Sequence, residues 1–308
     1  MTTDAPSPWR GQFVLASDVA RARSATAFYR AARAGGFVNV ARGVFLPAVV
    51  WNALSDDERH LARIHAVAAT STARHVHAYE SAAALWRLPI IGAWPKRVHI
   101  LAETNVSHSR AQWTAHVGNT FGETGEIDGL EVTTLARTVV DIARTRPLSV
   151  SVAMADAALR RKRVVHITAS DLDLELLRAS SYGLSRAREA ISFADGRSDS
   201  AGESLSRVGI HVLGFPAPVL QHEFRDAEGS MFADFWWPEF NLIGEFDGVS
   251  KYLQNELLNG QSTADALTRE KRRENRLRAL GPTVVRWGWA DARNLRLLEA
   301  KLRAGGLR

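Results

Sequence analysis

The sequence of 308 residues contains no cysteine, which excludes disulfide bonds and thiolate metal sites. It has no uninterrupted apolar stretch long enough to cross a bilayer. Its N-terminus also lacks a basic segment followed by a long apolar run. These absences predict a protein with no membrane span and no signal peptide, and a reducing cytoplasm is the compartment that suits it.

Positive charge is in excess, with 39 Lys and Arg against 33 Asp and Glu and a net charge of +6. This balance favours an acidic partner, nucleic acid above all, although an arginine-rich composition also arises in GC-rich genomes. Hydrophobic residues make up 46% of the chain and charged residues 23%, as in ordinary globular proteins. The length predicts two or three domains.

Residues 1–50 form the first expected domain. Residues 13–47 show a helix, a turn, a second helix ended by two glycines, and a short hairpin that turns at Arg42. Helix–turn–helix plus hairpin is typical of a winged helix. We therefore expect Arg30 and Arg33 on the second helix, and Arg42 at the tip of the wing, to contact DNA phosphates.

Residues 51–192 form the expected middle domain, which is mainly helical with some strand. Ser55 and Glu58 have the spacing of a capping box and predict the start of a helix. The segments VHAYESAAALWRLP and TTLARTVVDIARTRP also predict helices, and KRVHILA predicts a strand. His75 and His77 have no third ligand at a recognisable interval, so we interpret them as ordinary residues rather than as a metal site.

Residues 193–308 form the third expected domain, which follows the polar stretch FADGRSDSAGE. The pattern predicts a helix, three strands, a helix, a strand and a final helix. A turn over residues 238–241 predicts that the second and third strands pair antiparallel, with Trp237 opposite Leu242.

That register places Asp234 directly opposite Glu245, with Asp247 on the same face. Like charges that face each other across two strands cost a few tenths to about 1 kcal/mol. One remedy is a hard divalent ion such as Mg²⁺ between the carboxylates. The alternative is a solvated acidic face balanced by arginine, and the aromatic residues beside the acids argue against a fully wet face. The residue pattern leaves both interpretations open.

The last third of the chain carries several features in a fixed order. They are Glu203 on the first helix, GFPAPVLQ before the first strand, Asp234, the GEFDG strand, and a helix with Asp265 and Arg269. In this order they resemble the restriction-endonuclease-like, or PD-(D/E)XK, nuclease superfamily, within it the branch related to very-short-patch-repair endonucleases. The resemblance implies an αβββαβ core and, for the whole chain, an α+β multidomain fold.

The resemblance also implies the roles of the acids. Asp234 and Glu245 would bind Mg²⁺ or Mn²⁺, with Glu203 contributing from the helix, for hydrolysis of a phosphodiester. The lysine that the superfamily places two residues after Glu245 is replaced by Asp247, which would be a further ligand or a base for the water. From spacing alone, Glu203 and Arg207 would instead pair on the surface of one helix.

The basic segment TREKRRENRLRAL suits a DNA-facing helix, because phosphate neutralisation supplies most sequence-independent affinity. The candidate DNA contacts are Lys251, Arg269, Lys271 and Arg272, and the two lysines are also candidates for the missing cation. The alternative is a solvated helix with pairs between neighbouring Glu and Arg.

The N-terminal region resembles the winged-helix domain of abortive-infection type IV antitoxins, which implies a toxin as a partner; a bland helical domain is the alternative. Two hypotheses of function follow. The first is a DNA-binding protein with a metal-dependent, endonuclease-like C-terminal domain that acts on double-stranded DNA. The second is a non-catalytic winged-helix regulator, antitoxin-like, with a degenerate nuclease fold.

Overall fold

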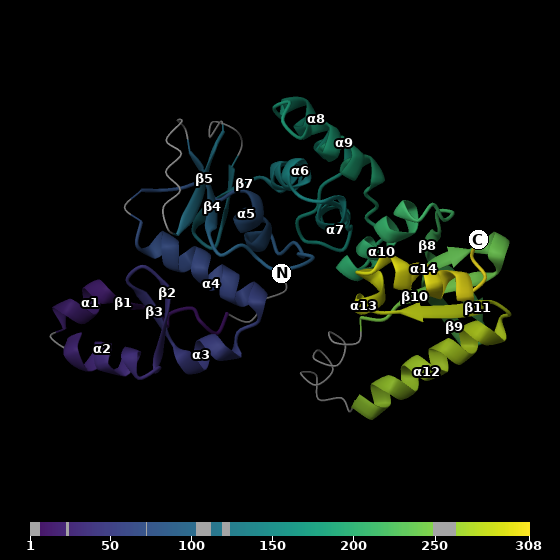
Figure 1. Ribbon diagram of the computed structural model, residues 1–308, viewed down its shortest axis with the longest axis horizontal. Helices are drawn as coiled ribbons and strands as arrows, with labels where there is room; N and C mark the ends of the chain where they lie inside the picture. The colour runs from purple at the N-terminus through teal and green to yellow at the C-terminus, as the bar shows by residue number, and fades with distance from the viewer. Residues whose placement is uncertain (1–6, 23–24, 72, 103–111, 119–123, 249–262) are drawn as a thin grey trace. The chain divides into compact units, whose positions relative to one another are not determined.

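A computed structural model describes residues 7–22, 25–71, 73–102, 112–118, 124–248 and 263–308 (Figure 1). The protein is of mixed α+β type and divides into two compact units. The first unit comprises Met1–Thr145 and Lys162–Ala187, and the second Arg146–Arg161 and Arg188–Arg308. No helix in the described ranges has both the length and the apolar character that a bilayer span requires.

The first unit begins with two short helices and a three-stranded antiparallel sheet in the order β1-β3-β2. These elements are β1 (Val14–Leu15), α1 (Ala16–Arg21), α2 (Ala25–Arg33), β2 (Phe37–Ala41) and β3 (Val44–Pro47). The predicted two helices and hairpin are confirmed. Helix α2 has no buried residue among those described, so most of its surface faces solvent.

The rest of the first unit surrounds small sheets with helices. The helices are α3 (Ala48–Ala53), α4 (Asp56–Ala69), α5 (Tyr79–Leu85), α6 (Leu135–Thr145), α8 (Ala169–Arg178) and the start of α9 (Leu184–Phe193). The strands are β4 (Val98–Ala102) parallel to β5 (Trp113–Val117), and β6 (Thr124–Ile127) antiparallel to β7 (Leu130–Thr133). The capping box of Ser55 and Glu58 at the start of α4 is confirmed.

One hydrophobic core joins the N-terminal sheet to the middle region. Val44 and Leu46 of β3 are buried in the same cluster as Ile64 of α4 and Val98 of β4. The two segments that the sequence suggests as separate domains therefore bury their apolar side chains together.

The second unit contains a four-stranded sheet in the order β11-β10-β9-β8. Its elements are α7 (Leu148–Leu159), α10 (Ala201–Val212), β8 (Val219–Asp226), β9 (Gly229–Trp237), η1 (Pro238–Phe240), β10 (Leu242–Phe246), α12 (Thr263–Ala279), β11 (Thr283–Trp287), α13 (Trp289–Ala292) and α14 (Leu295–Ala304). Strands β8, β9 and β10 pair antiparallel, and β11 is parallel to β10. The predicted order of a helix, three strands, a helix and a strand is confirmed, and the single final helix that was predicted is divided into α13 and α14.

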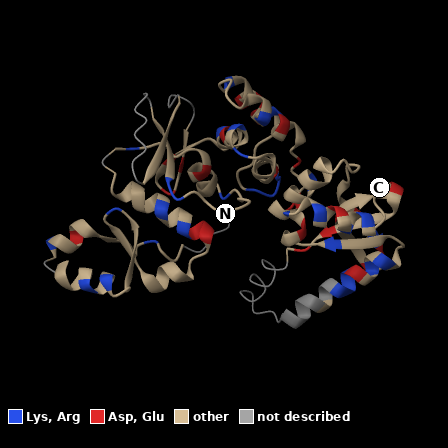
Figure 2. Ribbon diagram, viewed as in Figure 1, with Lys and Arg blue, Asp and Glu red and all other residues tan. Residues whose placement is uncertain are grey.

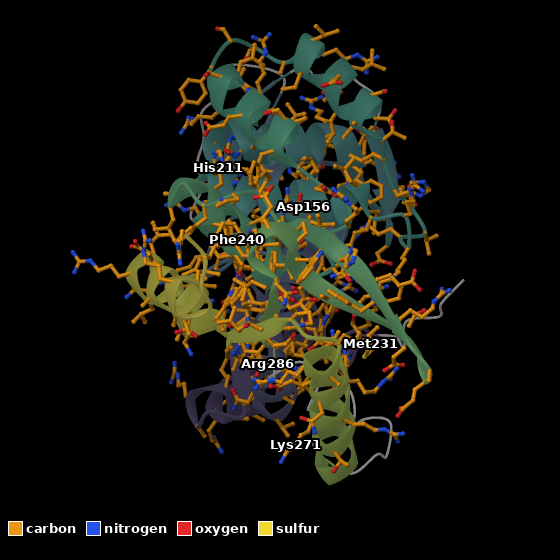
Figure 3. The ribbon with its side chains drawn as sticks, turned by 90° about the vertical axis from the view of Figure 1, so that its right-hand side faces the viewer. Asp156, His211, Met231, Phe240, Lys271 and Arg286 are labelled. Atoms are coloured by element: carbon orange, nitrogen blue, oxygen red, sulfur yellow. The ribbon has the colours of Figure 1, made fainter. Side chains whose placement is uncertain are left out.

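Helices pack on this sheet through specific side chains. Helix α12 buries Leu277 against Ile243 of β10 and Met231 of β9, and it runs close to the strand that carries Met231 (Figure 3). Helix α10 is tied to β11, because the indole nitrogen of Trp287 donates to the hydroxyl of Ser206 at 2.8 Å. The sheet is therefore held by apolar contacts with α12 and by a buried hydrogen bond to α10.

A buried ion pair attaches α7 to α10. Arg207 donates to Asp156 at 2.6 Å, and the Asp156 side chain is fully buried. The same arginine donates to the carbonyl of Phe193 at 2.7 Å. The expected surface pair of Glu203 and Arg207 is therefore wrong: Asp156, far away in the sequence, takes the guanidinium and leaves Glu203 to other partners.

His60 of α4 is a buried, uncharged histidine in the first unit. Its ring stacks on Trp94 with centroids 4.9 Å apart, and neither ring nitrogen has a hydrogen-bond partner in the described part of the chain. Burial, assisted by the nearby positive charge of Arg63, lowers the pKa of His60 from 6.5 to about 3. The unfolded chain binds a proton here below pH 6.5, whereas the folded chain does not.

We predict that acidification destabilises the protein through His60. The contribution of neutral His60 to the free energy of unfolding is fully present above the unfolded pKa of 6.5. It is lost as the pH falls towards the folded pKa of about 3. Between pH 7 and pH 5 the wild type should lose about 2 kcal/mol more unfolding free energy than His60→Phe, which keeps a ring against Trp94. Urea unfolding followed by circular dichroism measures this, with exposed His166→Phe as the control. Equal pH dependence in wild type and His60→Phe would contradict the prediction.

Candidate active site

Asp234 and Glu245 lie where strands β9 and β10 separate. The predicted register is confirmed, because Trp237 pairs with Leu242 and the ladder runs to Phe235 opposite Gly244. At the next position, one carboxylate oxygen of Asp234 accepts the backbone N–H of Phe246 at 2.8 Å. In a continued antiparallel ladder this N–H would donate to a backbone carbonyl of β9. Because it donates to the Asp234 side chain instead, the ladder between β9 and β10 ends at the acids.

Glu203 approaches the same point from the first turn of α10. Ser200 caps this helix, and its hydroxyl accepts the backbone N–H of Glu203 at 3.1 Å. The Glu203 carboxylate accepts the backbone N–H of Asp199 at 2.8 Å and the side-chain amide of Gln221 at 3.1 Å. The same amide nitrogen donates to Asp234 at 3.3 Å, so Gln221 links the two acids.

Gln221 is a site residue that the sequence interpretation missed. It has a φ of 49°, a left-handed conformation that typically costs about 1–3 kcal/mol for a non-glycine residue. The ladder between β8 and β9 pairs Leu220 with Phe235 and His222 with Ala233, and Gln221 lies between these two pairs, opposite Asp234. The sequence could have indicated Gln221 as a polar residue opposite Asp234. That inference also requires the pairing register between β8 and β9, which the sequence interpretation did not assign.

Gly202 brings the helix close to the strand. A Cβ atom at this position would overlap the ring of Phe246, so only glycine fits between α10 and the end of β10. The close approach places the neighbouring Glu203 near Asp234, whose carboxylate holds the backbone of the same Phe246.

The three acids of the site are buried close enough for their charges to act on one another. Glu203 and Glu245 are only 7% and 5% exposed. Burial, followed by the charges of Glu203 and Glu245, raises the pKa of Asp234 well above its usual range, against the opposing effects of the Phe246 N–H and Arg273. Burial likewise raises the pKa of Glu203. The three acids from α10, β9 and β10 therefore repel one another in a low-dielectric environment.

Arg273 of α12 is the cation that the structure places on Glu245. Its guanidinium donates to both carboxylate oxygens, at 2.8 Å and 3.1 Å, and also to the carbonyl of Phe232. This two-pronged arrangement is the strongest form of an arginine–carboxylate contact. It is a specific feature of the site that the sequence showed only as one of several basic residues.

The acids have the donor atoms that a hard divalent ion prefers, but their side chains are not arranged around a metal position. Carboxylate oxygens are the ligands that Mg²⁺ and Mn²⁺ prefer, and such an ion would relieve repulsion among the acids. In the part of the chain that the structure describes, however, no three His, Asp or Glu side chains meet in a geometry set to hold a metal. Arg273 already engages both oxygens of Glu245, so the ion would require Arg273 to move.

The other predicted residues of the second unit are more scattered. Asp247 follows the end of β10, where its backbone N–H donates to the carbonyl of Trp287 at 2.8 Å. Lys271, which Figure 3 labels, is exposed on α12. Arg272 is also exposed and pairs with Glu228 at 2.9 Å. Glu228 lies in the turn between β8 and β9; the pair within the helix that the alternative interpretation expects is seen instead between Arg278 and Glu274, at 2.7 Å. Two candidates fall outside what is described, namely Lys251 and the side chain of Arg269.

The predicted N-terminal contacts are exposed in the first unit. Arg30 and Arg33 lie on α2, and Arg42 lies in the turn between β2 and β3. Figure 2 shows positive charge along α2. None of the three pairs with a carboxylate of the described residues, so all three guanidinium groups are available to an external anion.

We predict that Asp234→Asn stabilises the metal-free protein. Asparagine keeps an oxygen for the Phe246 N–H but removes a buried charge that faces two other acids, so unfolding free energy should rise by about 1 kcal/mol. Urea unfolding at neutral pH with a chelator present measures this. Asp226→Asn is the matched control on the same sheet, because Arg276 lowers the pKa of Asp226 to about 2, and this variant should lose stability. A loss of stability in Asp234→Asn would contradict the account of the site.

Comparison with known proteins gives relatives but no function. No protein-family model matches the chain. Two proteins of Mycobacterium tuberculosis described as uncharacterized, MT2308 of strain CDC 1551 / Oshkosh and Rv2248 of strain ATCC 25618 / H37Rv, are 32% identical to it over 160 residues. The match covers 52% of the chain and 55% of each relative, so the chain spans about half the length of the curated relatives it matches. This similarity assigns no activity to the chain.

Proposed function

We propose that the chain is a DNA-binding protein whose residues 193–308 form a restriction-endonuclease-like domain, of the branch related to very-short-patch-repair endonucleases, that hydrolyses DNA phosphodiesters. The observation that carries the proposal is that three buried acids, Glu203, Asp234 and Glu245, lie close enough where β9 and β10 separate for their charges to raise the pKa of Asp234. The element order α10-β8-β9-β10-α12-β11 supports it, because it follows the αβββαβ core of that superfamily.

In this proposal Asp234 and Glu245 hold Mg²⁺ or Mn²⁺, with Glu203 beside them and Asp247 assisting. The bound ion supplies a Lewis acid that activates water and stabilises the developing charge on the phosphate. Gln221 keeps the carboxylates of Glu203 and Asp234 at one point, through donation to both. Burial of these acids excludes bulk water and strengthens their hold on a cation.

The N-terminal region serves as a winged-helix DNA-binding module in this proposal. Support comes from the two helices and the hairpin, and from the exposure of Arg30, Arg33 and Arg42 on α2 and the turn of the wing. Such a module suits double-stranded DNA in the cytoplasm, a compartment that also suits a chain without cysteine. The resemblance to antitoxins adds a toxin as a proposed partner.

A second candidate function is a non-catalytic DNA-binding regulator with a degenerate nuclease fold. One observation favours it specifically: Arg273 engages both oxygens of Glu245 in place of a metal, while the strand lysine of the superfamily is replaced by Asp247. Both candidate functions include the winged helix. They differ in whether the acids bind a metal and catalyse phosphodiester hydrolysis.

We predict that the purified protein nicks or cuts double-stranded DNA in the presence of Mg²⁺ or Mn²⁺. Asp234→Asn and Glu203→Gln should each lower the cleavage rate by at least about 100-fold, because each removes charge that holds the ion. DNA affinity, measured separately by fluorescence anisotropy, should stay within about twofold for both variants, since phosphate contacts elsewhere dominate it.

Glu223→Gln is the matched control for the cleavage assay. Glu223 lies on β8 of the same sheet, is exposed and pairs with Arg225, so its loss should leave cleavage unchanged. If wild type and all variants are equally inert on DNA while wild type still binds it, the regulator is the better account.

We predict that the N-terminal arginines supply salt-dependent DNA affinity. Arg30→Ala, Arg33→Ala and Arg42→Ala should each weaken binding and reduce the slope of log affinity against log salt by about 1, because each removes one phosphate contact. Arg178→Ala on α8 is the control, since that exposed arginine belongs to the same unit but pairs with Glu175. Unchanged slopes in all three variants would reject this role for the winged helix.

A further inference from the structure

Arg273 of α12 is paired with an acid of the proposed site rather than with an acid of the surface. Its guanidinium reaches from α12 to both oxygens of Glu245, a side chain only 5% exposed. A further bond to the carbonyl of Phe232 holds it on β9, at the strand that carries Asp234. The arginine thus joins α12 to the two strands at the point where their ladder ends.

Arg276 of the same helix makes a similar contact at a different place in the unit. Arg276, one turn further along α12, also binds a carboxylate twice, donating to Asp226 at 2.8 Å and 2.6 Å. That pair lies at the turn between β8 and β9, at the far end of β8 from the acids. Among the α12 side chains whose placement is described, Arg273 is the one seen to donate to an acid of the cluster that includes Asp234.

A bound cation and Arg273 would compete for the same oxygens. A divalent ion approaches a carboxylate along the lone-pair directions that the two N–H groups of Arg273 now use. It would bring two positive charges where the guanidinium brings one, which meets the charge of three acids better. The displaced guanidinium would remain beside the site, where its planar donors suit the phosphate of a bound nucleic acid.

We propose that Arg273 is an exchangeable counter-ion: it neutralises Glu245 when the metal is absent, gives up this carboxylate when a divalent ion binds, and then contacts the DNA phosphate at the cleavage site. The arginine is a positioning residue for the metal and a substrate contact after exchange. This inference rests on the proposed nuclease function, and it adds a step that controls when the site accepts its ion.

The experiment measures Mn²⁺ affinity of the full-length protein by electron paramagnetic resonance of the free ion at pH 8, without DNA. Arg273→Gln should bind Mn²⁺ about tenfold more tightly than wild type, because the ion no longer has to break two charge-assisted hydrogen bonds. Arg273→Lys, which keeps the charge with only one point of contact, should lie between them. Arg276→Gln is the matched control and should equal wild type.

Asp234→Asn separates the two levels of the proposal. If wild type binds Mn²⁺, Asp234→Asn removes this binding, and Arg273→Gln tightens it, both the site and the exchange are supported. If Asp234→Asn removes binding but Arg273→Gln binds no better than Arg276→Gln, the exchange is overturned and the metal site stands. If no protein binds Mn²⁺ through Asp234, the proposed nuclease site is overturned with it.

A measurement on the wild type avoids any effect of substitution on folding. In nitrogen-15 NMR spectra of the arginine side chains, a two-pronged contact slows rotation of the guanidinium of Arg273 and separates its terminal N–H signals. Saturating Mg²⁺ should remove this slow rotation for Arg273 and leave it for Arg276. Persistence of the slow-rotating Arg273 signals in saturating Mg²⁺ would overturn the exchange.

Discussion

Mutual repulsion among the buried carboxylates of Glu203, Asp234 and Glu245 is the constraint around which the second unit is built. Three like charges in a poorly solvated place destabilise a fold unless something neutralises them. Burial and repulsion raise the pKa of Asp234 and Glu203, and the structure opposes this with hydrogen bonds to these two acids and with an arginine on Glu245. A protein that needed only stability would place apolar residues there, so the acids favour a function.

Specific contacts of the surrounding fold hold these acids in position. Gly202 lets α10 touch the ring of Phe246, and the backbone of that residue binds Asp234. Gln221 accepts a left-handed backbone while its amide joins Glu203 to Asp234. Behind the site, the buried pair of Asp156 and Arg207 anchors α10 through α7. Strain and close packing thus converge on one point of the sheet, as functional sites often show.

The sequence predicted the register of the central hairpin because the residues on its apolar face alternate with period two, so a slip of one residue would exchange the two faces of the strand. It also predicted the helices and strands of residues 202–308, where the patterns are strong. Long-range polar partners could not be predicted. Nothing in the local pattern shows that Arg207 would find Asp156, that Gln221 would bridge two acids, or which arginine of α12 would reach Glu245.

The same limit explains the organisation of the chain. Composition suggested a break near residue 50 and another near 193. In the structure, apolar side chains of β3 and α4 share one core, Arg188–Arg308 belongs to the second unit, and α7 is tied to α10. Residues that are far apart in the sequence can be buried in the same core. A polar loop is therefore only an indirect sign of a domain boundary.

Diffraction from crystals of the full-length protein soaked in Mn²⁺, recorded for the anomalous signal of manganese, tests the central claim most directly. The account predicts a peak bonded to carboxylate oxygens of Asp234 and Glu245, with the guanidinium of Arg273 turned away from Glu245. Crystals with manganese elsewhere or nowhere, and with Arg273 still on both oxygens of Glu245, would contradict it.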